Sequence, residues 1–243
     1  MKRKTKRRVG IFLVVAMLAV MIYPAFSTTA EEESAGFIIE NGELTAYTGS
    51  GGDITIPDTV TGISDNVFSG NTSLTSVTIP GSVISIGSGA FSGCTNLYRA
   101  VVPASVVNIG NSVFAGCSSL SDLTFSANVG VIPDMAFYGC ASLSSVTIPG
   151  TVTSIGSSAF ENCTLLGSVT IPAAVDTISD TAFAGCSNLS SVEVDGGNAT
   201  YSSYDGCIYN KTQTKLLYEA LTAQGKKVKM VSYPCYESDS SAL

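Results

Sequence analysis

A phenylalanine recurs every 23 residues, without insertion, through the middle of this sequence. Three further columns keep the same step: Ile63 to Ile178, Val60 to Val175 and Leu74 to Leu189. A repeat of this length is typical of solenoids, in which short coils stack on one another. The repeated phenylalanines are Phe68, Phe91, Phe114, Phe137, Phe160 and Phe183.

The repetition has a physical reason. One short coil cannot bury its apolar edge alone, so it stacks on a near-identical neighbour, and each side chain packs against its counterpart in the next coil. With ~4.8 Å between hydrogen-bonded strands, six coils would make a slab about 30 Å long. A buried phenylalanine contributes about 1.5–3 kcal/mol, so we expect this column to form the core.

Each coil divides into three pieces. The stretch SVTIP at 76–80 alternates Val and Ile with Ser and Thr and ends at a proline, which predicts a half-buried strand. VISIG at 83–87 predicts a second short strand, and SGAFSGC at 88–94 predicts one helical turn. We therefore expect strands on both broad faces. The glycines expected to end the turns with a positive φ are Gly70, Gly93, Gly116, Gly139 and Gly185.

The phrase V-x-x-I-G-x-x-A-F-x-G-C-x-x-L-x-x-V-x-I-P, which covers residues 54–194, resembles the BspA-like leucine-rich repeats of bacterial surface proteins. The resemblance implies a mostly β leucine-rich-repeat solenoid of stacked 23-residue coils. It also implies a secreted or surface-displayed, adhesin-type module whose relatives engage host matrix proteins, and it implies no enzyme activity. The departures from the pattern are modest: Asn71 replaces the column Cys, Asn162 the column Gly, and Ser126 and Asp195 the column Pro.

The same pattern suggests boundaries. We expect a signal peptide at 1–30, an N-terminal cap at 31–53, a repeat array of about six coils at 54–194, a C-terminal hairpin cap at 195–217 and an irregular tail at 218–243. The register fails after Leu217, where the chain has neither an A-F nor an I-P pair. A divergent tail explains this failure, and a shift of reading frame near residue 217 is the alternative.

The first thirty residues carry six Lys or Arg, then an apolar run, then small residues before an acidic stretch. This order predicts a secretory signal peptide cleaved near Ala30, with Ala25 to Ser27 as the alternative site and an uncleaved membrane anchor as the alternative role. Cleavage would remove six of the twelve basic residues and none of the nineteen acidic ones, which leaves a net charge of −13. So acidic a chain is a poor nucleic-acid binder, and we expect no membrane insertion after cleavage.

The composition also restricts catalysis. The chain has no histidine, which excludes Ser-His-Asp and Cys-His arrangements and histidine-containing zinc sites. Its acidic residues are scattered over different columns, mostly in turns, so a glycosidase pair is not indicated. We expect no catalytic residue, no metal site and no cofactor.

Five of the seven cysteines occupy one repeat column, at Cys94, Cys117, Cys140, Cys163 and Cys186. A column of five cannot pair completely, and a free cysteine packs well as a small apolar side chain. We interpret the column as an inert ladder of buried thiols, with a disulfide or structural metal role as the alternative. Cys207 and Cys235 lie outside the column, and their exposure is left open.

Departures from the repeat indicate where a ligand could bind. Tyr98 and Arg99 stand where other coils carry mostly Ser, Thr or Gly, and aromatic and Arg residues dominate binding hot spots. Asp122 either joins them in a site or simply pairs with Arg99. Tyr138, which follows its column phenylalanine where Ser or Ala is usual, is a second candidate, and the tyrosines at 201, 204 and 209 form a third group.

These observations favour a secreted or cell-surface, adhesin-like module that binds an extracellular protein or glycan through an extended repeat face. The alternative is a structural spacer, or a remnant of a longer repeat array, with no ligand of its own.

Overall fold

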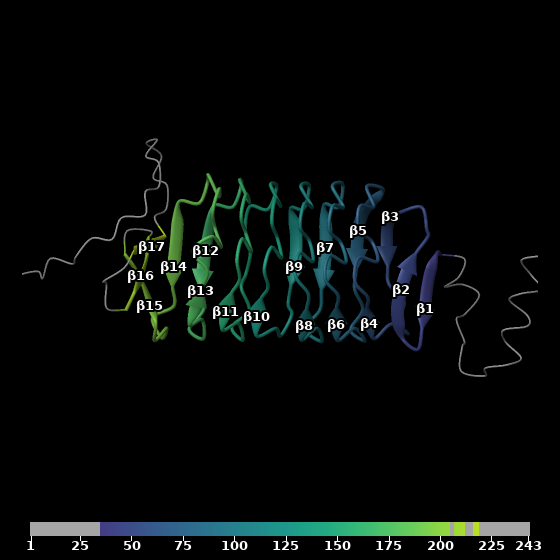
Figure 1. Ribbon diagram of the computed structural model, residues 1–243, viewed down its shortest axis with the longest axis horizontal. Helices are drawn as coiled ribbons and strands as arrows, with labels where there is room; N and C mark the ends of the chain where they lie inside the picture. The colour runs from purple at the N-terminus through teal and green to yellow at the C-terminus, as the bar shows by residue number, and fades with distance from the viewer. Residues whose placement is uncertain (1–34, 205–206, 212–215, 219–243) are drawn as a thin grey trace, which may run out of the picture.

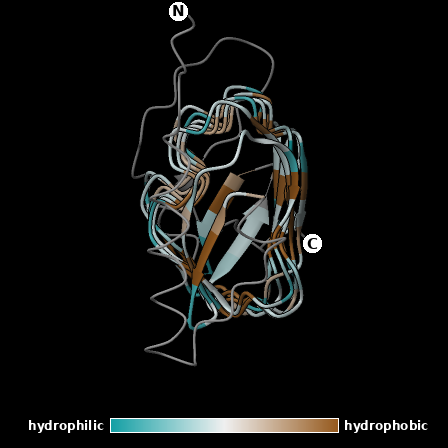
Figure 2. Cartoon of the chain, turned by 90° about the vertical axis from the view of Figure 1, so that its right-hand side faces the viewer, coloured by the Kyte–Doolittle hydropathy of each residue, from teal (hydrophilic) through white to brown (hydrophobic). Residues whose placement is uncertain are grey.

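The computed structural model describes residues 35–204, 207–211 and 216–218, and the predicted signal peptide, most of the predicted tail and Cys235 lie outside these residues. The described residues form a column of stacked coils, elongated along one axis (Figure 1). Viewed along that axis, successive coils overlie one another as one closed outline (Figure 2). The prediction of a mostly β solenoid with a 23-residue step is confirmed, because paired strands lie 23 residues apart, as Ser154 and Thr177 do.

Longer strands form one surface, which we call the long-strand face. They pair in parallel, and their side chains alternate, so that in β7 Ala100 and Val102 are buried whereas Arg99 is exposed. The strands of this face are β3 (Gly52–Thr55), β5 (Leu74–Thr78), β7 (Arg99–Val102), β9 (Asp122–Phe125), β12 (Ser168–Ile171) and β14 (Ser191–Val194).

Two-residue strands form a second surface, the short-strand face, which Figure 1 shows as a separate row below the longer strands. An antiparallel hairpin, β1 and β2, pairs with the first of these strands and closes the sheet at its N-terminal end. The members are β1 (Phe37–Glu40), β2 (Glu43–Tyr47), β4 (Gly62–Ile63), β6 (Ser85–Ile86), β8 (Asn108–Ile109), β10 (Val131–Ile132), β11 (Ser154–Ile155) and β13 (Thr177–Ile178).

The third side of each coil, which we call the turn edge, contains the phenylalanine and the segment predicted as a helical turn. Consecutive hydrogen-bonded turns occupy this segment, and the described residues contain no helix. The five column glycines all have a positive φ of 68–73°, as predicted, and Asn162 adopts 61° in the same column. Backbone bonds join every coil to the next along this edge, as from Phe114 N to Ala136 O at 2.8 Å.

The six column phenylalanines are buried, and their rings stack nearly parallel with centroids 5.0–5.8 Å apart. Tyr47 extends this stack by contacting Phe68 on one side and Phe37 on the other. The widest spacing, 5.8 Å, separates Phe114 from Phe137. The core is therefore one continuous column of rings that spans the array.

Both sheets are interrupted near the centre of the array. Among the described residues no pairing joins β8 to β10, because Pro133 stands where Gly110 and Gly156 each donate an N–H to the preceding coil at 2.8 Å. On the long-strand face, residues 145–148 form only an isolated bridge from Ser145 to Ser168. The turn edge is continuous past both interruptions, so it holds the two halves together.

The C-terminal end is closed by a three-stranded sheet of β15 (Tyr201–Tyr204), β16 (Cys207–Asn210) and β17 (Leu216–Tyr218). Asn198 fixes this sheet to the array, because its buried amide donates to the carbonyls of Pro172 and Val175 and accepts from the N–H of Thr200 and Tyr201. Among the described residues no helix is long and apolar enough to cross a membrane.

Candidate functional site

Arg99 opens β7 on the long-strand face, and Tyr98 immediately precedes this strand. Tyr98 is 45% exposed, which is unusual for a large apolar ring on a surface otherwise made of small side chains. Its backbone is fixed on both sides, since its N–H donates to Thr75 and its carbonyl accepts from Ser121 and Asp122. The tyrosine is therefore presented on a rigid strand, which lowers the entropic cost of binding a ligand.

Arg99 and Asp122 occupy neighbouring rungs in register, and they form an ion pair with 3.6 Å between Nε and Oδ2. Both side chains are about half exposed, at 51% and 57%, so the pair contributes only about 0–1 kcal/mol to stability. A guanidinium has five N–H donors, and this contact uses the Nε side alone. The ion pair thus orients Arg99 and leaves donors for a ligand.

Tyr138 lies on the turn edge, away from the strand that carries Tyr98. It is half buried rather than fully exposed, and its carbonyl accepts a bond from Gly116 N at 2.6 Å. No ring contact joins it to Tyr98 within the described ranges. The structure therefore pairs Arg99 with Asp122, places Tyr98 next to Arg99 along the chain, and positions Tyr138 on a different side of the coil.

Of the hairpin tyrosines, Tyr201 serves a structural role, and the side chain of Tyr204 lies outside the described residues. Tyr201 is buried, and its hydroxyl donates to the carbonyl of Asp176 and accepts from the N–H of Ile178. Burial raises the pKa of this hydroxyl above its usual value of 10. Tyr209 is half buried. Tyr201 thus holds the C-terminal sheet to the array.

The column cysteines are buried and free, and each Sγ donates to the carbonyl of the phenylalanine 26 residues earlier, at 3.0–3.2 Å. Burial raises the pKa of Cys94 and Cys186 to about 11 and that of Cys163 to about 12. Such thiols stay protonated at neutral pH, which makes them poor nucleophiles and metal ligands. Cys207 is also buried, and the described residues contain no group of three or more potential metal ligands.

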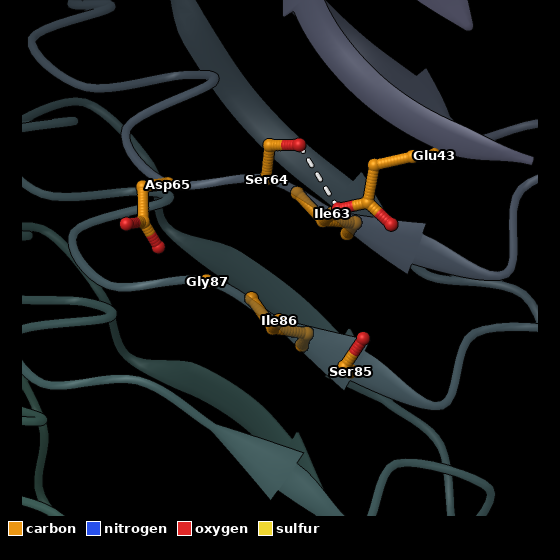
Figure 3. A pocket seen from close by; sticks show the side chains of 7 residues that line it. All are labelled: Glu43, Ile63, Ser64, Asp65, Ser85, Ile86 and Gly87. Carbon is orange, nitrogen blue, oxygen red and sulfur yellow. Dashed lines mark hydrogen bonds between the residues drawn. The ribbon is translucent and has the colours of Figure 1, made fainter. Parts of the chain in front are cut away.

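The structure also contains a hollow that the sequence did not indicate. It lies over β2, β4 and β6 on the short-strand face, has a volume of about 510 Å³, and is lined by Glu43 and Asp65 together with Ser64, Ser85 and the backbone of Gly87 (Figure 3). Glu43 precedes the repeat array, so no column comparison predicts its position. The signal in the sequence is Gly62, where an added Cβ would collide with the Glu43 carboxylate.

Comparison with known proteins identifies related sequences and structures. The family model described as the BspA type leucine rich repeat region matches residues 45–166 and 109–222, with six copies. Among curated proteins none shows a significant match to the chain.

Two crystal structures resemble the array at moderate identity. A leucine rich cell surface protein from Faecalibacterium prausnitzii A2-165 is 32% identical, with a TM-score of 0.56, over 72% of this chain and 56% of that one. A leucine rich repeat protein from T. pallidum is 33% identical, with a TM-score of 0.62, over 69% of this chain and 81% of that one. The chain therefore spans little more than half the length of the first of these proteins.

Proposed function

Because the chain belongs to the BspA-type leucine-rich-repeat family, we propose that it is a secreted or cell-surface module, adhesin-like and non-catalytic, that binds an extracellular protein or glycan through its long-strand face. The similar protein from F. prausnitzii is described as a cell surface protein, which supports an extracellular location. The predicted signal peptide with cleavage near Ala30 supports the same location.

The observation that carries the binding proposal is the exposed Tyr98 beside the Arg99–Asp122 ion pair. Elsewhere on this face the outward positions of the strands are mostly Ser and Thr, so these residues are the distinctive chemical feature of the surface. An aromatic ring can stack on a sugar or pack against a protein side chain, and a guanidinium can bind a carboxylate or an amide oxygen. Neighbouring rungs would add weaker contacts along the same face.

The test is a binding screen of the full chain against immobilised fibrinogen, fibronectin and mucin and against a glycan array. Each positive interaction is then measured with the double variant Tyr98→Ser, Arg99→Ser. We chose serine because Ser occupies the same columns in other coils, so the fold should be preserved. We expect saturable binding that the double variant weakens at least tenfold.

Two results would contradict the proposal. Absence of saturable binding to every probe would favour the structural spacer. Binding that the double variant retains would refute the assignment of the site to Tyr98 and Arg99. Asp122→Asn, which removes the negative charge and keeps the shape, serves as a matched variant for the ion pair.

A further inference from the structure

Exposed aliphatic side chains lie at the start of three successive short strands: Ile84 and Val107 immediately precede β6 and β8, and Val131 opens β10. Ile84 is 52% exposed, Val107 44% and Val131 46%, and they lie on three successive coils. Ile84 and Val107 share a column in which Thr61 and Thr153 occupy other coils. We call these three side chains the aliphatic stripe. Its residues follow directly on the hollow, because Ile84 precedes Ser85, which lines it.

The hollow supplies negative charge next to this stripe. Figure 3 shows Glu43 and Asp65 at opposite ends of the group that lines it. One Glu43 oxygen accepts from the Ser64 hydroxyl at 2.9 Å, and one Asp65 oxygen accepts from the N–H of Ser88 at 2.6 Å. These bonds fix the two carboxylates and leave the second oxygen of each for a ligand. Neither carboxylate has a cationic partner in the described part of the chain.

The charged side chains around the short-strand face are negative. In the described ranges the basic residues are Arg99 and Lys211, and neither belongs to the short-strand face. Arg99 lies in β7, and Lys211 donates to the carbonyl of Asn198 at the C-terminal sheet. Further carboxylates flank the face at Asp134 and Asp176. A partner with positive charge would therefore be attracted, whereas a polyanion would be repelled.

We propose that the short-strand face binds an extended basic polypeptide segment, with a Lys or Arg side chain in the hollow between Glu43 and Asp65 and aliphatic side chains on the stripe of Ile84, Val107 and Val131. The surface goes beyond the proposed function because it lies on another face and does not involve Tyr98 or Arg99. A glycan is disfavoured here because neither the hollow nor the stripe contains an aromatic ring for a sugar to stack on.

The dimensions of the surface set the length of the segment. Four rungs separate β2, which carries Glu43, from β10, which carries Val131. At ~4.8 Å a rung this distance is about 19 Å, which about six residues of extended chain cover at ~3.3 Å each. Alternate side chains of an extended segment point the same way and lie about 6.6 Å apart. A cationic residue followed by three aliphatic residues at alternate positions therefore spans about 20 Å and covers the surface end to end, without placing one side chain on each ~4.8 Å rung.

The experiment measures binding of the full chain to a fluorescent octapeptide, acetylated and amidated, in which one Lys followed by three Val alternate with Ser. One control peptide has Glu in place of Lys, and the other has Ser in place of each Val. Fluorescence anisotropy is recorded at low and at high salt. We expect saturable binding of the first peptide, weakened at least tenfold by either replacement and weakened by salt.

Two double variants locate the site without disturbing the fold. Glu43→Gln with Asp65→Asn removes both charges but keeps the oxygens that accept from Ser64 and Ser88. Ile84→Thr with Val107→Thr introduces the residue that the same column holds in other coils. We expect each double variant to bind the peptide that contains Lys and Val at least tenfold more weakly than the unaltered chain does. The matched control, Tyr98→Ser with Arg99→Ser, should bind this peptide as the unaltered chain does.

The inference is overturned if the first peptide shows no saturable binding, if the Glu peptide binds as tightly, or if both short-strand variants bind unchanged. Loss of peptide binding in the Tyr98 and Arg99 variant alone would assign the peptide to the long-strand face, which also overturns it. Failure here leaves the proposed function standing, because that function is tested by different probes on the other face.

Discussion

Replacing Phe114 by alanine tests whether the column of rings holds the stack together. Phe114 is fully buried, with its ring between Phe91 at 5.2 Å and Phe137 at 5.8 Å. The neighbouring coils cannot close over the resulting cavity, because backbone bonds of 2.8–2.9 Å along the turn edge hold their spacing. The cost should therefore lie near the top of the range for such substitutions, at about 4–5 kcal/mol.

This loss corresponds to a fall in melting temperature of roughly 8–20 °C, at about 2–4 °C per kcal/mol for a domain of this size. The assay is thermal unfolding of the full chain followed by circular dichroism. The matched control is Asn111→Ser on the same coil, where Ser88 and Ser157 occupy the column, and it should change stability by less than about 0.5 kcal/mol. If Phe114→Ala melts at the same temperature as Asn111→Ser, the column of rings does not hold the stack together.

Three further predictions concern buried polar groups. The column thiols should resist iodoacetamide at pH 8 in the folded chain and react in urea, as mass spectrometry would show, and labelling of the folded chain at the rate of free cysteine would contradict their burial. Burial raises the pKa of Cys94 and Cys186 from 9.0 to about 11. The contribution of these buried thiols to the free energy of unfolding is therefore complete below pH 9 and is lost as the pH rises towards 11. A urea midpoint that stays constant between pH 9 and pH 11 would contradict this pH dependence. Asn198→Ala removes four hydrogen bonds and should cost about 2–4 kcal/mol in urea unfolding, and a loss below about 1 kcal/mol would show that this amide does not hold the C-terminal sheet.

The sequence predicts those parts of the fold that every coil shares. Columns such as Phe91 and Val83 recur because each residue packs against its own copy, so the repeat reports the packing directly. The positive φ at Gly93 is predictable for the same reason, because a turn that recurs in every coil has the same backbone conformation each time. The helical turn was harder to specify, because single hydrogen-bonded turns and a short helix share one sequence pattern.

Features that belong to a single coil were not predicted. The interruption at Pro133 depends on one missing N–H, and the isolated bridge at Ser145 has no counterpart in the residue pattern. The burial of Asn198 is also not predictable from the sequence, because the nearby Asp195, Gly196 and Gly197 indicate only a loop.

The two candidate binding surfaces also differ in how far the sequence predicts them. Tyr98 and Arg99 are visible in the sequence because they interrupt columns of small polar residues, and Ile84 and Val107 interrupt their column in the same way. The sequence marks the hollow only through Gly62, because the hollow depends on how Glu43 of the N-terminal hairpin lies against Ser64 of the first coil. Contacts between a cap and a repeat leave no periodic signal.

Both binding surfaces depend on the coils being equivalent units in a 23-residue register. The most direct test is to delete residues 75–97, which removes one whole coil, and to compare this chain with one lacking residues 75–96. The first deletion brings Arg99 beside Asp53 in register and should give a β-rich chain that melts cooperatively. The second shifts every later column by one residue and should abolish cooperative melting. Equal melting of the two chains, or failure of the whole-coil deletion to fold, would contradict equivalent coils in a 23-residue register.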